Sequence, residues 1–240
     1  MRVAVLSDIH ANLPALDAVL AALDPLDAIW VLGDTVGYGP QPDEVVERLE
    51  ERGARAVLGN HDAAALGRIE TDTFNDDARA AVEWTAERLG APARAWLGGL
   101  PERTEEGIFT MVHGSPRDPL WEYCFSVPVA RRNLAAFQTA HCLVGHTHVP
   151  LVFRDTDGRV EMLSPSHGSR LPLDERRTIL NPGGVGQPRD GDPRACAMLL
   201  DPEANVAEWR RVEYPVEEVQ ALMREVGLPD RLVRRLESGL

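Results

Sequence analysis

Short apolar segments alternate with amphipathic segments in the first 60 residues, and this alternation constrains the fold more than any other feature. The runs RVAVLS, AIWVLG and ARAVLG have the length and composition of strands buried on both faces. Between them, residues 13–23 carry leucines at helical spacing, and residues 42–52 form an amphipathic segment with acidic residues in its first turn. This order predicts parallel strands joined by right-handed crossovers.

The pattern changes near residue 150. Before that point we expect helices over 75–89, capped by Asn75 or Asp76, and over 92–101 and 129–137, with strands over 107–114 and 141–146. After it we expect a hairpin over 149–163 that turns at Asp157-Gly158, strands over 177–184, 194–201 and 206–214, and helical segments over 216–227 and 229–239. Residues 164–176 are expected to form an exposed loop. The chain is thus predicted to be α/β, with two sheets packed face to face and helices outside, in a single domain spanning 1–240.

Charge and composition exclude several classes of function. The net charge of −13 repels a phosphate backbone, so we expect no extended nucleic acid as partner, although bound cations would still admit a small phosphorylated substrate. All 25 basic residues are arginine, which excludes Schiff-base lysines and P-loop lysines. No apolar run is long enough for a membrane span and the N-terminus lacks a signal-peptide pattern, so we expect a cytoplasmic protein. Cys124, Cys142 and Cys196 are expected to be reduced, partly buried thiols.

Five short polar motifs stand where predicted strands end, and together they carry five of the seven histidines. They are SDIH with Asp8 and His10, GDTVGYGP with Asp34, GNHD with Asn60, His61 and Asp62, VHGSP with His113, and GHTH with His146 and His148. Each motif alone is compatible with an ordinary turn. Because ligands bind beyond the carboxyl ends of strands in α/β sheets, we expect the five motifs to meet at one edge. Carboxylate, imidazole and amide ligands suit two divalent transition-metal ions. Manganese is favoured, with iron, zinc, cobalt or nickel as alternatives.

The ordered series D-x-H, GD, GNHD, H and GHTH resembles the calcineurin-like metallophosphoesterase superfamily, by motif over residues 1–150 and more weakly in NPGGVGQPRDGDPRA, in the manner of its small bacterial phosphodiesterases. The resemblance implies a four-layer α/β/β/α sandwich of two mixed sheets flanked by helices. It implies that Asp8, His10 and His148 hold one metal, that Asn60, His113 and His146 hold the other, that Asp34 bridges them, and that His61 is the proton donor. Where relatives often carry serine in the NPGG loop this chain has Gly184, so a side-chain contact is expected to be missing there.

The predicted activity is metal-dependent hydrolysis of a phosphoric ester. Two cations about 4 Å apart generate a bridging hydroxide that attacks phosphorus, and His61 is placed to protonate the leaving group as general acid. Asp62 could orient His61 or pair elsewhere. A small phosphodiester is favoured over a phosphomonoester, because the motifs contain no basic cradle for a dianion. Tyr38 is a candidate substrate contact or part of a rigid turn. Arg189 and Arg117 are each either a substrate contact or an ordinary surface arginine.

Three alternatives stay open. An asymmetric dinucleoside polyphosphate hydrolase would need a ring to stack on adenine, and Tyr38 or Phe74 could supply it. A non-catalytic binding or scaffold protein on the same fold would not need His61, which is present. A nuclease acting on structured nucleic acid fits the acidic charge least well. A homo-oligomer is left open, because the leucine-rich C-terminal segment could pack either on its own domain or on a second subunit.

Overall fold

Two six-stranded sheets form the centre of the protein. The computed structural model describes residues 1–240. The first sheet has the order β3 (Arg55–Ala56), β2 (Ala28–Val31), β1 (Val3–Leu6), β11 (Ala195–Asp201), β12 (Val206–Val212) and β9 (Arg170–Pro172). The second has the order β4 (Arg103–Glu106), β5 (Phe109–Val112), β6 (His141–Leu143), β10 (Thr178–Pro182), β7 (Pro150–Thr156) and β8 (Arg159–Leu163). Each sheet therefore begins with strands that precede residue 150 and is completed by strands that follow it.

Both sheets are mixed. The first three strands pair in parallel, β1 with β2 and β2 with β3, as the alternation predicted. In the second sheet β6 is parallel to both β5 and β10. The remaining pairs are antiparallel, among them the hairpin β7–β8, whose turn at Asp157 and Gly158 has positive φ at both residues (53° and 82°). Positive φ at both central residues is the geometry that a two-residue hairpin turn requires.

The inner faces of the two sheets share one apolar core. Along β1, Val3 and Val5 belong to this inner core, whereas Ala4 and Leu6 belong to the core on the outer face. Trp30 of β2 and Phe109 of β5 meet across the interface with ring centroids 5.6 Å apart. Because every side chain of β1 is buried on one face or the other, its sequence is continuously apolar rather than alternating.

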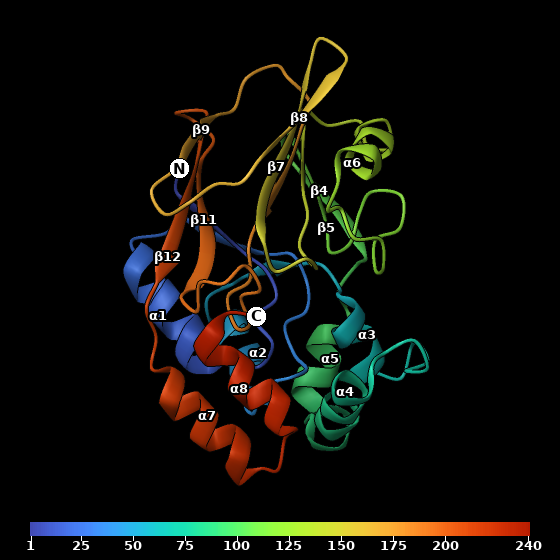
Figure 1. Ribbon diagram of the computed structural model, residues 1–240, viewed down its shortest axis with the longest axis vertical. Coiled ribbons are helices and arrows are strands. Elements are labelled where there is room, and N and C mark those ends of the chain that lie inside the picture. The colour runs from blue at the N-terminus through green and yellow to red at the C-terminus, as the bar shows by residue number, and fades with distance from the viewer.

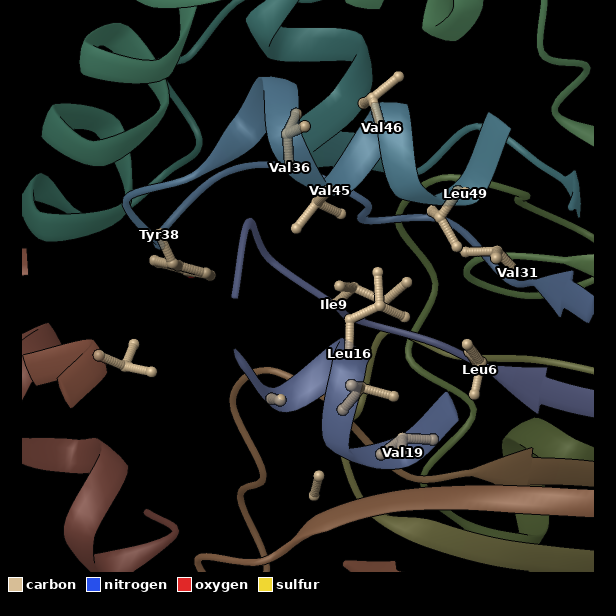
Figure 2. Close-up of a cluster of buried hydrophobic side chains, with 14 of the residues drawn as sticks. Leu6, Ile9, Leu16, Val19, Val31, Val36, Tyr38, Val45, Val46 and Leu49 are labelled. Carbon is tan, nitrogen blue, oxygen red and sulfur yellow. The ribbon is translucent and has the colours of Figure 1, made fainter. Parts of the chain in front are cut away.

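Helices cover the two outer faces (Figure 1). The larger outer core joins the first sheet to α1 (Leu13–Leu23), α2 (Pro42–Glu51), α4 (Asp76–Arg88), α5 (Ala91–Gly98), α7 (Val216–Glu225) and α8 (Asp230–Ser238). Figure 2 shows part of it, where Leu16 and Val19 of α1 lie near Leu6 and Ile9 of the first strand and loop. On the second sheet, α6 (Val127–Leu134) covers the opposite face. The layers are therefore α/β/β/α.

Three elements differ from the sequence-based expectation. The GNHD motif, for which no helix was predicted, opens a short helix, α3 (Asn60–Ala65). The polar edge strand β4 was not predicted, because RTEE has no apolar alternation and is ordered by pairing with β5. The expected loop over 164–176 contains the three-residue strand β9, which exists through pairing with β12. Each of these elements depends on contacts that local periodicity does not report.

Two composition-based expectations can be compared with the structure. Cys124, Cys142 and Cys196 are free and buried, as expected. None of the helices combines the length and the apolar character that a membrane span requires.

Candidate metal centre

Eight of the nine polar residues singled out in the motifs are considered first, and they lie in loops or at the start of a helix at one edge of the sandwich. Asp8 and His10 follow β1, Asp34 follows β2, and Asn60 and His61 begin α3 just after β3, whereas His113 follows β5 and His146 and His148 follow β6. All eight are buried, and none is more than 4% exposed. Loops from both sheets therefore bring these residues together in one region shielded from bulk water.

Asp8, His10 and His148 form the first cluster, with candidate ligand atoms within 4.8 Å of one another. The Nε2 atoms of His10 and His148 are 3.3 Å apart, and Oδ1 of Asp8 is 3.2 Å from Nε2 of His148. Nδ1 of each ring faces a main-chain carbonyl oxygen, that of Val36 at 3.1 Å for His10 and that of Gln187 at 2.6 Å for His148. A proton on each Nδ1 leaves the Nε2 lone pairs directed into the cluster.

Asp34, His113 and His146 form the second cluster. Nε2 of His113 lies 3.0 Å from Nδ1 of His146 and 3.0 Å from Oδ1 of Asn60. Nδ1 of His113 faces the Leu32 carbonyl oxygen at 2.8 Å, so Nε2 is again the inward nitrogen. His146 is turned the opposite way, because its Nδ1 faces the cluster while its buried Nε2 has no hydrogen-bond partner.

The carboxylate of Asp34 lies between the two clusters. Its Oδ2 is 3.6 Å from Nε2 of His10 and 3.3 Å from Nε2 of His113. Its Oδ1 is turned away and accepts a hydrogen bond of 2.9 Å from the main-chain N–H of His61. One oxygen therefore faces both clusters while the other fixes the orientation of the side chain.

The donor set fits divalent cations. In the second cluster, Nε2 of His113 lies 3.0 to 3.3 Å from the inward atoms of Asn60, His146 and Asp34. This is close to the spacing of about 3.0–3.4 Å expected for ligands bound at roughly 2.1 Å to one metal. In the first cluster, Oδ1 of Asp8 is buried without a hydrogen-bond partner, and burial is the main reason why the pKa of Asp8 rises to about 7. Burial alone would lower the pKa of His113, but the carboxylate of Asp34 raises it to about 9. The site therefore favours positive charge at its centre.

Strained backbone accompanies these side chains. Asp8, His10, Asp34, His146 and His148 all have φ between 50° and 63°. Residues other than glycine adopt this region rarely, at a cost of about 1–3 kcal/mol each. Such strain at five residues of one site indicates that the surrounding fold holds the loops in place to position the side chains.

The sequence comparison agrees with this geometry. The family model described as the calcineurin-like phosphoesterase superfamily domain matches residues 1–205. The chain belongs to this superfamily. It is accordingly a metal-dependent hydrolase of phosphoric esters, and the superfamily uses a dinuclear metal centre.

Relatives are similar over nearly the whole chain. A metallophosphoesterase from Sphaerobacter thermophilus, known from its crystal structure, is 48% identical, with a TM-score of 0.92 over 100% of this chain and 99% of that one. An uncharacterized protein of Methanocaldococcus jannaschii is 35% identical over 99% of this chain and 98% of its own length. The phosphodiesterase YfcE of Escherichia coli is 29% identical over 83% of this chain and 87% of its own length.

In this phosphoesterase, His61 lies beside both clusters without entering either. Its ring packs against Tyr38, His10 and Phe74, with centroid distances of 4.3, 5.0 and 4.9 Å. Nδ1 is buried without a partner, and a Cβ at Gly37 would lie 2.6 Å from it. Nε2 is therefore the ring nitrogen able to meet a bound molecule. Burial is the main reason why the pKa of His61 falls to about 4.

Asp62 makes contacts away from the His61 ring. Its Oδ1 accepts from the main-chain N–H of Val36 at 2.9 Å, and its Oδ2 accepts from that of Gly59 at 3.0 Å. The carboxylate thus connects the start of α3 to the loop that follows Asp34. Of the two roles considered for Asp62, these hydrogen bonds favour pairing with the backbone.

The glycines that precede candidate ligands serve different purposes. Gly33 has φ of +82°, which a side chain would make unfavourable, as expected for a sharp turn. Gly145 has no such conformation; a Cβ there would overlap Oγ of Ser7 and lie 3.2 Å from Oδ2 of Asp8. Ser7 in turn donates to Oδ2 of Asp8 at 2.7 Å. Gly145 is therefore required for close approach of two loops.

Gly184 of the NPGG loop lies against the first cluster. A Cβ there would be 3.1 Å from Cβ of His148, which is tighter than an ordinary contact. The main-chain oxygen of Gly184 accepts from the N–H of Cys196 at 3.0 Å. Gly184 therefore leaves room for the side chain of His148.

The pocket above the clusters has a volume of about 90 Å³. Of the substrate contacts considered from the sequence, Tyr38 and Arg189 line it, and the Arg189 guanidinium lies 5.5 Å from the centroid of the Tyr38 ring. Arg117 is outside this lining and pairs with Glu122 at 3.2 Å.

Two aromatic residues of the pocket were not predicted. Trp121 and Tyr123 come from the loop between β5 and α6. The Tyr123 ring stacks on His146 at 3.9 Å, with the planes 23° apart, and Trp121 meets Phe74 at 5.4 Å. The sequence LWEYCF, which begins three residues after the VHGSP motif, was the available signal for an aromatic pocket wall.

Proposed function

We propose that the two clusters bind a pair of divalent metal ions. Asp8, His10 and His148 would hold one ion, and Asn60, His113 and His146 the other. Asp34 would bridge them through Oδ2. The observation that carries this assignment is the position of that oxygen, 3.6 Å from Nε2 of His10 and 3.3 Å from Nε2 of His113. Manganese is the proposed metal, because the ligands are imidazole, carboxylate and amide without thiolate.

Bound metals would supply a hydroxide nucleophile near neutral pH and neutralise charge on the phosphoryl oxygens. The protein contributes geometry to this chemistry. Carbonyl oxygens of Val36, Leu32 and Gln187 hold the imidazole rings in their tautomers. Burial of the site excludes competing water, which strengthens every electrostatic contact inside it.

His61 is proposed as the general acid. Its main-chain N–H is anchored to Oδ1 of Asp34 at 2.9 Å, so the side chain stands at a fixed place beside both clusters. Nε2 would give its proton to the departing oxygen. The pKa of His61 is about 4 in the protein without ligand. A bound phosphate anion therefore has to raise this pKa before His61 can act as an acid near neutral pH.

We propose a small phosphodiester as substrate, in keeping with the name of the phosphodiesterase relative from Escherichia coli. The test is turnover of bis-p-nitrophenyl phosphate, p-nitrophenyl phosphate and diadenosine tetraphosphate after loading with Mn²⁺. Diester turnover above monoester turnover is expected. Absence of turnover on all three by protein with two bound metals would refute the proposal.

A dinucleoside polyphosphate is the second candidate substrate, and the aromatic pocket wall favours it. Tyr123 is 50% exposed and carries a ring beside the clusters on which a base could stack. Tyr38 and Phe74, considered for this role from the sequence, are 6% and 8% exposed, so little of either ring is accessible. Product analysis on diadenosine tetraphosphate tests this candidate and separates asymmetric from symmetric cleavage.

The variant His61→Ala separates the proposed hydrolase from a binding protein that does not use the metal centre. Loss of turnover with both metals retained supports the hydrolase. An unchanged cellular role in that variant would support the binding function.

A further inference from the structure

The structure brings a second arginine beside Arg189 that no motif in the sequence marks. Arg235 belongs to α8, near the end of the chain, and α8 lies beside α7 in the lower half of Figure 1. Nη1 of Arg235 donates to Oε1 of Gln187 at 3.1 Å, and Nη2 of Arg189 donates to the same oxygen at 2.8 Å. Because they share one acceptor, these nitrogens lie no more than about 6 Å apart.

This pair of guanidinium groups has no acidic side-chain partner. No Asp or Glu carboxylate lies within 4.0 Å of either arginine, although neighbours on the same helix are paired, Arg234 with Asp230 and Arg231 with Asp77. Nε of Arg235 donates at 2.5 Å to an oxygen of the C-terminal residue Leu240, whose carboxylate offsets part of the charge of the pair. Two like charges so close repel each other unless an anion lies between them.

Burial adds to the charge imbalance. Both arginines are partly buried, and Nε of Arg189 is buried without a hydrogen-bond partner. Burial first, and the charge of Arg189 second, lower the pKa of Arg235 to about 10. In a chain of net charge −13, two adjacent, partly buried arginines without an Asp or Glu side-chain partner are a local exception to the surrounding field.

The pair is directly connected to the metal centre. Gln187, which accepts from both arginines through its side chain, accepts from Nδ1 of His148 through its main-chain oxygen at 2.6 Å. Arg189 also lines the pocket above the clusters and lies over the Tyr38 ring. An anion held by the pair would therefore lie beside a phosphoryl group held at the metals.

We infer that Arg189 and Arg235 form a subsite for a second phosphoryl group, adjacent to the one that is hydrolysed. The substrate class is then a compound with neighbouring phosphoryl groups, such as a nucleoside polyphosphate or another phosphoanhydride. Guanidinium groups suit this ligand because they form charge-assisted hydrogen bonds to phosphate oxygens. Nε and Nη1 of Arg189 and Nη2 of Arg235 are the nitrogens that Gln187 and Leu240 leave free for it. This inference rests on the proposed function for the place of cleavage, and it supplies the basic cradle that the sequence motifs lacked.

The experiment compares pyrophosphate with orthophosphate as ligands of the Mn²⁺-loaded protein, by calorimetric titration at fixed free Mn²⁺. The wild type is expected to bind pyrophosphate at least tenfold more tightly. Arg235→Gln and Arg189→Gln are each expected to weaken pyrophosphate binding by about 10- to 100-fold, the range for a charge-assisted hydrogen bond, and to weaken orthophosphate binding much less. Arg224→Gln is the matched control, because this exposed arginine of α7 changes the net charge equally and touches neither Gln187 nor the pocket.

The variant Gln187→Glu distinguishes an anion-binding role of the two arginines from a purely structural one. A carboxylate at the shared acceptor would neutralise the pair, so the variant is expected to melt at a higher temperature and to lose the preference for pyrophosphate. Equal losses for both ligands in the arginine variants, or an unchanged preference in Gln187→Glu, would overturn the inference.

Turnover of bis-p-nitrophenyl phosphate by the wild type is measured separately. Its absence, together with absence of turnover of p-nitrophenyl phosphate and diadenosine tetraphosphate, would refute the proposed function, whereas the titrations would still report on the subsite.

Discussion

Asn12 connects two loops of the metal centre, and replacing it by alanine tests whether that connection supports the fold. Oδ1 of Asn12 caps α1 by accepting from the N–H of Ala15 at 3.1 Å. Nδ2 donates to the carbonyl oxygen of Gly186 at 2.9 Å, in the loop that also carries Gln187. The side chain is 1% exposed, so water cannot replace either hydrogen bond after truncation.

The expected loss can be estimated from these two bonds. Removing an N-cap costs about 1 kcal/mol, and leaving a buried carbonyl without its donor costs about 1–3 kcal/mol. Asn12→Ala should therefore lower the free energy of unfolding by about 2–4 kcal/mol. For a chain of this size, that corresponds to a fall in melting temperature of roughly 4–16 °C.

Asn75→Ala is the matched control. Asn75 caps α4 by accepting from the N–H of Ala78 at 3.0 Å, but it is exposed and makes no bond to a distant loop. Asn75→Ala should therefore lower the free energy of unfolding by only about 1 kcal/mol. Guanidinium chloride unfolding of metal-free protein measures both values. Equal losses in the two variants would refute the idea that the Asn12–Gly186 bond supports the fold.

Three further predictions concern the centre itself. His61→Ala should lower kcat by about 10²- to 10⁴-fold, as for loss of a general acid, with two metals per chain still found by elemental analysis; loss of the metals would instead make His61 a ligand. Chelation of the metals should abolish turnover, and turnover that survives chelation would exclude the metal mechanism. Mn²⁺ at about 100 times its dissociation constant should restore turnover. It should also stabilise the fold by about 2.7 kcal/mol per site, measured as a higher melting temperature. Gly145→Ala should destabilise the protein by about 1–3 kcal/mol, because the new Cβ meets Oγ of Ser7. In the control Gly99→Ala the nearest atom to the new Cβ would be 3.5 Å away, so the free energy of unfolding should change by less than about 0.5 kcal/mol. Similar effects of the two variants on guanidinium chloride unfolding would contradict the steric argument.

Much of the fold could be predicted from local sequence. The helices over Leu13–Leu23 and Pro42–Glu51 and the hairpin turn at Asp157 and Gly158 follow from periodicity and turn chemistry, which act between neighbours in the chain. The strands β4 and β9 were not predicted in this way, because RTEE of β4 shows no apolar alternation and β9 is only three residues long; both are ordered by their partner strands.

The sequence by itself determined which residues are candidates for the centre, because each motif follows a strand and parallel strands of one sheet end at a common edge. The packing of the two sheets then brought the motifs of both sheets together. The tertiary structure alone decided how they are held: that Asp34 turns one oxygen to both clusters, and that Asp62 bonds to backbone N–H groups. It also placed Arg235 beside Arg189, 46 positions apart, through one oxygen of Gln187. The physical reason is range: propensity and periodicity act over a few residues, whereas a shared hydrogen-bond acceptor between distant loops leaves no pattern in either segment.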